Sequence, residues 1–330
     1  MVLMTVLLIV QGCSDVIEDD VTITVGGWAR DRVESSYTVP GDPDKKKKSY
    51  KYEVVIEDWD YDVEAFLMRA ATGQLPTIYD VAYTDMERIK NSGYGTDITD
   101  YLEKGYTDFL DGRILELISK DGRIYAIPSQ VYVMGMLFNA ELFREAGLQR
   151  LDGSYVLPQT LDELVEIAKI IRDRTGASGF LLPVDGNTGG WVFSNIAWEF
   201  GVEFIIKDKE GNWKANFDTP ECVKALQWVK ELKWKHDILP ENPFTNQEQS
   251  WALLASGQSA MLMDDPYRSI NKIITDYGIQ KDDIGVFTLP AGPEGRIALM
   301  GGALLCINNT ATEEELDAAF HLLEEVVLPS

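Results

Sequence analysis

The sequence predicts an α/β protein with two domains, each a mainly parallel β-sheet flanked by helices. Segments with strand character alternate with segments of helical periodicity along most of the chain, which is typical of α/β units around parallel sheets. The 330 residues are enough for two domains with cores of their own. Hydrophobic residues make up 45% and charged residues 25%, as in ordinary globular proteins.

The charge balance and the motif content exclude several classes of protein. A net charge of −24 argues against nucleic acid as a partner, because binding to phosphates needs clustered Lys and Arg. The chain has 2 histidines, too few for a histidine-based zinc site, and it lacks the nucleotide-binding, serine-hydrolase and zinc-protease motifs. We therefore expect no catalytic residue, no cofactor and no metal.

The chain opens with an apolar run that ends at a cysteine, MVLMTVLLIVQGC. The run is shorter than the ~20 residues of a membrane-spanning helix, and its length suits the apolar core of a secretory signal peptide. Val10-Gln11-Gly12-Cys13 resembles the lipobox of bacterial lipoproteins, although no Lys or Arg precedes the run. We expect residues 1–19 to be signal peptide and tether, with Cys13 lipidated. The alternative is a buried first strand.

Strands are expected where β-branched and aromatic residues gather in short apolar or alternating runs. We place them at residues 20–28, 51–59, 78–84, 121–139 (two strands split at Pro128), 179–184, 259–263, 283–290 and 303–308. Helices are expected where apolar residues recur at helical spacing. We place them at residues 62–73 and 139–148, and after Thr160, Thr219 and Thr312. Residues 29–50 contain two prolines and leave room for only a short helix.

Three of these helices carry clear start signals. Thr160 and Glu163 form a capping box, in which the hydroxyl and the carboxylate each accept a hydrogen bond from a free backbone N–H. Thr312 and Glu315 have the same spacing, and Pro220 follows Thr219 at a first helical position. The apolar stripes predicted to be buried are Leu161, Leu164, Val165, Ala168 and Ile171; Val223, Leu226, Val229 and Leu232; and Leu316, Ala319, Phe320 and Leu323.

Aromatic residues gather at predicted strand ends and in turns, where open α/β sheets place their ligands. These residues are Trp28, Trp59, Tyr83, Tyr132, Trp191 and Tyr267. Aromatic faces stack on the apolar faces of sugars, while Asp, Asn, Gln and Arg satisfy sugar hydroxyls. Trp28, Trp191 and Tyr267 lie beside Gly or Pro, and we expect them to contact a ligand. The tryptophans inside helical patterns, which we expect in the core, are Trp198, Trp228 and Trp234.

Taken together, these features resemble the extracellular solute-binding proteins of ABC sugar transporters, the maltose-binding-protein-like group. The phrases that carry the resemblance are DGRIYAIPSQVYVMGMLFNAELFREAGL, PQTLDELVEIAKII, FDTPECVKALQWVKEL, LLASGQSAMLMDDPYR, and VFTLPAGPEGR followed by MGGALLCIN. The resemblance runs from about residue 20 to the end, and it implies a two-lobed type II periplasmic-binding-protein fold. Residues 20–127 and 290–330 would form the first lobe and residues 128–289 the second. The chain stops directly after a helix, so we expect the C-terminal part of this fold to be truncated.

The resemblance also implies a sugar or oligosaccharide site in a cleft between lobes that close by hinge motion. The hinge would pass at Pro128 and Pro290, with Gly292 allowing it to bend. The ligand-binding positions that the resemblance implies are Trp28, Tyr83, Thr84, Asp85, Gln130, Tyr132, Trp191, Asp265, Tyr267, Arg268, Gly301 and Gly302. Trp59, which follows the second predicted strand, is also expected to bind the ligand.

The expected function is therefore extracytoplasmic sugar capture. A monomeric lipoprotein, lipid-anchored to the outer face of the bacterial cytoplasmic membrane, would deliver its sugar to the permease subunits of an ABC importer. Two alternatives remain: a binding protein for a non-sugar solute such as a polyamine or peptide, and a surface glycoside hydrolase with a carboxylate pair. Cys222 and Cys306 are either two buried thiols or a pair, because spacing alone does not show whether they can reach each other.

Overall fold

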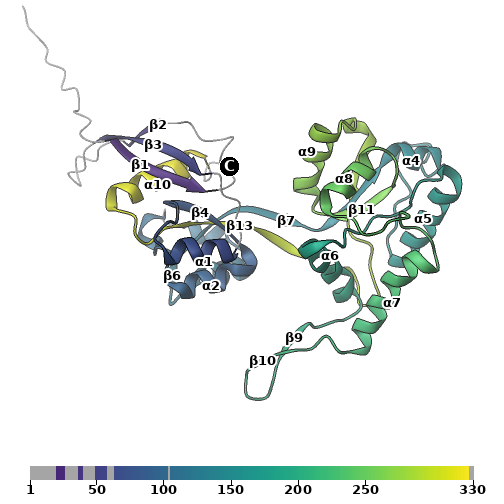
Figure 1. The fold of residues 1–330 in the computed structure, drawn as a ribbon, viewed down its shortest axis with the longest axis horizontal. Helices are drawn as coiled ribbons and strands as arrows, with labels where there is room; N and C mark the ends of the chain where they lie inside the picture. Colours follow the sequence, from purple (N-terminus) through teal and green to yellow (C-terminus); the bar gives the residue numbers. More distant parts are fainter. Residues whose placement is uncertain (1–19, 27–35, 40–48, 58–62, 103–104, 327–330) are drawn as a thin grey trace, which may run out of the picture. The chain divides into compact units, whose positions relative to one another are not determined.

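The computed structural model describes the chain except for residues 1–19, 27–35, 40–48, 58–62, 103–104 and 327–330 (Figure 1). The chain forms two compact units. Unit 1 comprises residues 1–131 and 301–330, and unit 2 comprises residues 132–300. The chain leaves unit 1 within strand β7 (Ile127–Val133) and returns at the start of strand β13 (Met300–Ile307).

Unit 1 is built on a six-stranded mixed sheet with the order β2-β3-β1-β4-β13-β7. Strand β1 pairs in parallel with β3 and β4, whereas β2 and β13 pair antiparallel with β3 and β4 respectively. Besides β7 and β13, this sheet contains β1 (Asp20–Gly26), β2 (Ser36–Val39), β3 (Tyr50–Glu57) and β4 (Ile78–Ala82). Strand β2 lies in the region where the sequence left room for only a short helix.

The helices of unit 1 cover this sheet and close its core. They are α1 (Val63–Ala71), α2 (Met86–Ser92), α3 (Gly112–Ile118) and α10 (Glu313–Val326). Helix α10 packs against β1 and β2 (Figure 1). The fully buried Tyr52 of β3 has its hydroxyl 3.2 Å from Nδ1 of His321 on α10, and the hydroxyl of Tyr50 donates to the Glu314 carbonyl over 3.0 Å. The last helix therefore stabilises strands from the beginning of the chain.

The predicted strand break at Pro128 is wrong. Strand β7 runs through Pro128, and the breaks lie at residues 125–126, between β6 (Arg123–Ile124) and β7, and at Met134, between β7 and β8 (Gly135–Asn139). The reason is the place of β7 at the edge of the unit 1 sheet. A residue without an N–H is tolerated on an edge strand because one side of the strand has no ladder hydrogen bonds to lose.

Unit 2 contains a three-stranded sheet that differs from the parallel sheet expected. Strand β8 lies between β11 (Met261–Asp264) and β12 (Ile284–Phe287) and pairs antiparallel with both. The chain enters unit 2 along β8. Helix α9 (Pro266–Tyr277) then connects β11 to β12, and these two strands run in the same direction, opposite to β8. Parallel pairing is found at single bridges, Ser178 with Ser259 and Leu181 with Leu262.

The other helices of unit 2 surround this sheet. They are α4 (Ala140–Glu145), α5 (Leu161–Thr175), α6 (Gly186–Glu199), α7 (Pro220–Trp234) and α8 (Gln247–Ala255). The predicted stripe of α5 is fully buried. The cap of α5 differs in one detail: Thr160 Oγ1 accepts from the N–H of Glu163 over 3.2 Å, but the Glu163 carboxylate accepts from Gln159 rather than from Thr160, over 2.7 Å.

The buried face predicted for α7 is wrong by about one residue in the first half of the helix, whereas Leu232 is buried as predicted. Val223 and Leu226 are 63% and 53% exposed, and the buried positions are Cys222, Ala225 and Leu232. Neighbouring residues on a helix lie about 100° apart, so the predicted and the observed stripes face different directions. Apolar residues occupy most of the circumference of α7, so the sequence alone does not show which of the two stripes is buried. Trp234, expected in the core, is 78% exposed at the end of this helix.

Between α6 and α7 the chain forms a hairpin that the sequence analysis did not anticipate. Strands β9 (Ile205–Lys207) and β10 (Trp213–Ala215) pair antiparallel as a separate two-stranded sheet. The Asp208 carboxylate holds the turn by accepting hydrogen bonds from the N–H groups of Glu210 and Asn212, at 3.0 and 2.9 Å. Figure 1 shows the hairpin extending away from the helices of unit 2.

Candidate ligand-binding site

Three predicted ligand residues of unit 1 meet where strand β4 ends. Tyr83 follows β4 directly and is buried, and its hydroxyl has no hydrogen-bond partner among the described residues. A Cβ on Gly302 would lie 2.0 Å from the Gln130 carbonyl oxygen and 2.9 Å from two ring atoms of Tyr83. Gly302 is therefore required for β13 to pass between the Gln130 backbone and the Tyr83 ring. Burial raises the pKa of Tyr83, so its hydroxyl is available as a donor.

The neighbours of this group were only partly anticipated. Thr84 is exposed and Asp85 half-buried at the start of α2, while Gly301 is buried in β13. Tyr106, which the sequence analysis missed, lies near Tyr83: burial raises the pKa of Tyr106 to about 12, and the neighbouring Tyr83 adds to the shift. No sequence signal marks Tyr106, since it sits in a short turn of 3₁₀-helix far from any predicted strand end.

In unit 2 the structure brings together four predicted residues from three separate segments. The rings of Tyr132 and Trp191 meet edge to face, with centroids 5.8 Å apart and an interplanar angle of 73°. Burial raises the pKa of the Tyr132 hydroxyl, the nearby Asp265 carboxylate raises it further, and the Arg268 guanidinium opposes both. We call Tyr132, Trp191, Asp265 and Arg268 the unit 2 cluster. It offers an aromatic corner beside one acid and one base.

Asp265 is positioned by the turn from β11 into α9. Its Oδ1 accepts a hydrogen bond from the N–H of Tyr267 over 2.9 Å and caps the helix, with Pro266 at the first helical position. Asp265 is buried, and burial raises the pKa of its carboxyl. Tyr267 is 59% exposed, so its ring is free to contact a ligand. Arg268 is also exposed.

Asp264, which the sequence analysis missed, anchors this turn from behind. It is fully buried, and each carboxylate oxygen accepts two hydrogen bonds. Oδ1 accepts from the Gln247 side chain at 2.7 Å and the Asp265 N–H at 2.8 Å. Oδ2 accepts from the Trp251 indole and the Ser269 hydroxyl, both at 2.7 Å. One carboxylate therefore ties α8 and α9 to the end of β11.

The predicted hinge residues have different surroundings. Pro128 lies in β7, shortly before the crossing, but Pro290 and Gly292 lie inside unit 2. Gly292 and Gly295 exchange hydrogen bonds of 3.0 and 3.1 Å, and a Cβ on Gly292 would lie 2.6 Å from Cβ of Glu199. Close packing, and not the crossing between units, explains the glycine at position 292. The chain returns to unit 1 only after residue 300, because residues 291–299 stay hydrogen-bonded to unit 2. For example, the Leu299 N–H donates to the Asn195 side chain over 2.7 Å.

Glu199, beneath this turn, is expected to make stability depend on pH. The residue is fully buried, its Oε2 has no hydrogen-bond partner among the described residues, and burial raises its pKa from 4.5 to about 8. Between these values the unfolded chain is ionised while the folded carboxyl keeps its proton. The folded state therefore binds more protons, and the unfolding free energy falls as pH rises through this window.

Glu199→Gln removes this titration. We expect the variant to exceed the parent in unfolding free energy by roughly 2–4 kcal/mol at pH 8, with little difference at pH 5. Urea denaturation of both proteins at the two pH values measures it, with the exposed Glu203→Gln as the matched control. A gain of the same size at pH 5 and pH 8 would show that ionisation of Glu199 is not the cause.

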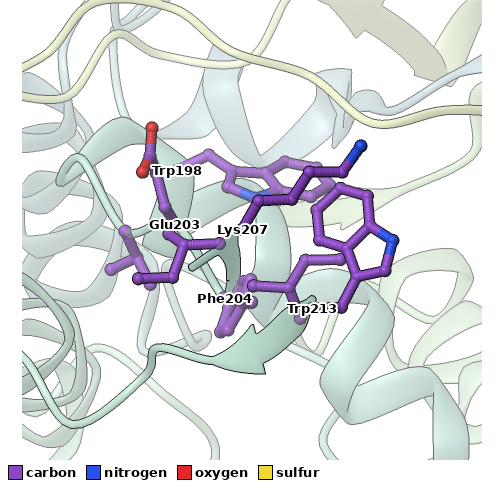
Figure 2. Close-up of a pocket in the computed structure, with 8 residues that line it drawn as sticks. Trp198, Glu203, Phe204, Lys207 and Trp213 are labelled. Atoms are coloured by element: carbon purple, nitrogen blue, oxygen red, sulfur yellow. The ribbon is translucent and has the colours of Figure 1, made fainter. Parts of the chain in front are cut away.

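The structure also shows a pocket that contains none of the predicted ligand residues. It lies in unit 2, where the hairpin meets the end of α6 (Figure 2). Its lining is Trp198, Val202, Glu203, Phe204, Ile205, Ile206, Lys207 and Trp213. Trp198 was expected in the core, but it is only half-buried and faces this pocket. We call this pocket the hairpin groove.

Several predicted features lie outside the described residues: the tether 1–19 with Cys13, and Trp28 and Trp59. Cys222 and Cys306 are both buried free thiols, in units 2 and 1 respectively. Across the described part of the chain, no helix is long and apolar enough to span a membrane. In that same part, no three His, Cys, Asp or Glu side chains are grouped as metal ligands would be.

Relatives of known function share sequence with most of this chain. It is 28% identical over 249 residues to an arabinooligosaccharide-binding protein of Halalkalibacterium halodurans, covering 73% of this chain and 53% of that protein. It is 23% identical over 283 residues to the diacetylchitobiose-binding protein DasA of Streptomyces coelicolor, covering 84% and 62%. The chain thus spans between half and two thirds of the length of these relatives.

Solved structures share the fold. Maltose-bound MalE3 of T. maritima superposes with a TM-score of 0.70 at 24% identity, covering 93% of this chain and 76% of that one. The GacH receptor of Streptomyces glaucescens superposes with a TM-score of 0.69 at 18% identity, covering 94% and 79%. At these identities the likeness establishes the type II periplasmic-binding-protein fold.

The family assignment rests on the sequence as a whole. The profile described as "Bacterial extracellular solute-binding protein" matches residues 31–326, nearly the full chain. The relatives above are named as sugar-binding proteins, and the structural neighbours are ABC-transporter solute-binding proteins of the maltose-binding type. The chain therefore belongs to the bacterial extracellular solute-binding proteins.

Proposed function

We propose that this protein captures a sugar or oligosaccharide outside the cytoplasm and delivers it to the permease subunits of an ABC importer. The observation that carries the proposal is the unit 2 cluster, which gathers Tyr132, Trp191, Asp265 and Arg268 from three segments. An aromatic corner beside a carboxylate and a guanidinium suits a ligand with apolar C–H faces and many hydroxyls. Family membership supports the same class of ligand.

The chemistry of the cluster favours a neutral ligand. Asp265 and Arg268 bring opposite charges to one place, so neither a cation nor an anion is selected by net charge. A buried carboxyl and an exposed guanidinium together accept and donate hydrogen bonds, which matches hydroxyl groups. The relatives that bind arabino-oligosaccharides and diacetylchitobiose support neutral oligosaccharides as the ligand class.

Tyr83 supplies the corresponding surface in unit 1. Its ring is fixed against Gly302 and the Gln130 backbone, and its buried hydroxyl has no partner among the described residues. We propose that the same ligand contacts Tyr83 and the unit 2 cluster, and that the two units close on it. A ligand shifts such an equilibrium only by its difference in affinity for the two states, so contacts from both units are needed to favour the closed form.

We also propose that the protein is a monomer held at the outer face of the bacterial cytoplasmic membrane by a lipid on Cys13. The lipobox-like Val10-Gln11-Gly12-Cys13 motivates the anchor, and the extracellular character of the family supports the location. Globomycin treatment of expressing cells, with mass spectrometry of the N-terminus, tests it. Loss of a lipidated Cys13 peptide on treatment supports the anchor, and an unmodified Met1 in the mature protein contradicts it.

Binding to the unit 2 cluster is tested with a ligand panel and two variants. Calorimetric titration with arabino-, chito-, malto- and xylo-oligosaccharides, a polyamine and a short peptide identifies the ligand. Trp191→Ala is expected to weaken binding by at least about tenfold, because a lost aromatic contact in a desolvated site costs more than 1 kcal/mol. Tyr267→Ala, at an exposed position, tests the site without endangering the fold.

The matched control for both variants is Trp234→Ala, which removes an exposed indole from α7 of the same unit. Its affinity should equal that of the parent. Binding of the polyamine or the peptide instead of a sugar contradicts the proposed ligand class. Turnover of a bound glycan would favour a hydrolase, and equal affinity of Trp191→Ala, Tyr267→Ala and the parent would place the site elsewhere.

A further inference from the structure

The hairpin between α6 and α7 exposes an apolar face. Ile205 and Lys207 alternate along β9, and their partners across the ladder are Ala215 and Trp213. Because side chains alternate across a strand, these four share one face of the two-stranded sheet. All four are exposed, Ile205 at 60% and Trp213 at 65%. A two-stranded sheet is marginal in water by itself, and Ile205 and Trp213 give this face apolar surface that a ligand can cover.

The face is shaped and held in place by neighbouring contacts. The Lys207 ammonium lies 4.7 Å from the centre of the Trp213 ring, so the cation steadies the indole (Figure 2). Trp198 packs edge to face on Phe204, with centroids 6.4 Å apart. Two indoles thus line one hollow, each with a neighbouring side chain against its ring. They provide stacking surfaces with little conformational entropy left to lose on binding.

The charges around the hairpin groove are balanced. Lys207 and Glu203 both line the groove (Figure 2). Lys214 is engaged by the Asp208 carboxylate at 3.2 Å. The surroundings therefore offer one donor and one acceptor without a net charge. A neutral ligand with hydroxyl groups suits these partners better than a charged peptide or an anionic polymer.

The hairpin groove is separate from the unit 2 cluster. Trp191 and Trp198 lie two turns apart on α6. Asn195 lies between them and Glu199 directly follows Trp198, and both are fully buried. Asn195 Oδ1 accepts from the N–H of Leu299 over 2.7 Å, and Glu199 Oε1 accepts from that of Ile297 over 3.4 Å. The segment before β13 therefore packs along the part of α6 that carries Asn195 and Glu199. A ligand in the groove would contact a different set of side chains.

We propose that the hairpin groove is a second carbohydrate site, which holds a neutral glycan chain on Trp198 and Trp213. It stands independently of the function proposed for the unit 2 cluster, because all of its lining residues lie outside that cluster. The two indoles stack on the apolar faces of sugar rings. Lys207 and Glu203 bond to the hydroxyls at the edges. Such a site retains polymeric glycan at the surface of unit 2.

Native gel electrophoresis in gels containing a soluble neutral polysaccharide (arabinan, xylan, starch or galactomannan) tests the proposal. We expect at least one of them to retard the full chain. Trp213→Ala should weaken this retention by about tenfold, while Trp213→Phe, which keeps an aromatic ring, should preserve it. The matched control is Trp234→Ala, which removes an exposed indole far along α7 and should leave retention unchanged.

Results of three kinds would overturn the proposal. The first is an absence of retardation of the parent in every neutral polysaccharide. The second is equal retardation of Trp213→Ala and the parent, or equal retardation of the parent by anionic polygalacturonate. The third is light scattering that shows a dimer of the parent and a monomer of Trp213→Ala, which would make the hairpin face an interface between copies. Unchanged oligosaccharide titration of Trp213→Ala separates this site from the unit 2 cluster.

Discussion

Asp264→Asn is expected to destabilise unit 2 by roughly 3 kcal/mol or more and to weaken ligand binding. The carboxylate accepts four hydrogen bonds, from Gln247, Trp251, Asp265 and Ser269. An asparagine has one acceptor oxygen, and its NH₂ group would face two of these donors without accepting from either. Because the same carboxylate holds the start of α9, the change also loosens Asp265, Tyr267 and Arg268. The melting temperature should fall by roughly 6 °C or more.

Thermal denaturation and calorimetric titration measure the two effects. Asp282→Asn, at an exposed position of the same unit, is the matched control for the change in charge and should shift neither. Asp264→Glu keeps the charge but moves it by one methylene group, and it should fall between parent and asparagine variant in stability. An asparagine variant as stable as the parent would mean that the four donors find other partners, and Asp264 would lose its assigned role.

Gly302→Ala is the second change with a large expected effect. The added methyl group would lie 2.0 Å from the Gln130 carbonyl oxygen, which belongs to the backbone of the neighbouring β7. A paired strand has no flexible end that could give way, so β7 and β13 must separate locally and the Tyr83 ring must move. Overpacking of this kind costs roughly 1–3 kcal/mol. Affinity for the ligand should fall as well, because Tyr83 and Gln130 are both displaced.

Gly112→Ala is the matched control in the same unit. Gly112 begins α3, a Cβ there has nothing within 4 Å, and alanine favours helix, so this variant should be as stable as the parent or slightly more so. Urea denaturation and ligand titration of the two alanine variants make the comparison. If Gly302→Ala retains both stability and affinity, the contact of β13 with Gln130 and Tyr83 is looser than the structure indicates.

Much of the fold could be predicted from local patterns, and the failures have local reasons. The capping signals at Thr160, Thr219 and Thr312 located three helices, because a cap depends on a few adjacent residues. The break predicted at Pro128 failed because only the sheet order shows that β7 is an edge strand. The buried face of α7 failed because its apolar residues define two stripes, and only the packing partner decides between them.

Some residues of the candidate site could likewise be predicted from the sequence, and others could not. Tyr132 and Trp191 were suggested by local signals, since aromatic residues gathered at predicted strand ends and turns, and the family resemblance added Asp265 and Arg268. The structure brings the four together. Asp264 was missed because its donors come from two helices that only the fold brings to β11. The one available signal was an acidic residue at the end of the buried strand MLMD. The hairpin groove was missed because the short β9 and β10 were not recognised as strands.

The placement of β13 has a consequence for how the chain reaches its native state. This strand lies between β4 and β7, yet the ribosome makes it only after the whole of unit 2. The Asn308 side chain donates to the Leu75 carbonyl across 233 positions in the sequence. Closing so long a loop is slow and entropically costly, and prior folding of residues 132–300 shortens the effective loop. Unit 2 should therefore fold first during synthesis or after export. The sheet of unit 1 would wait with a gap between β4 and β7 until the last strand inserts.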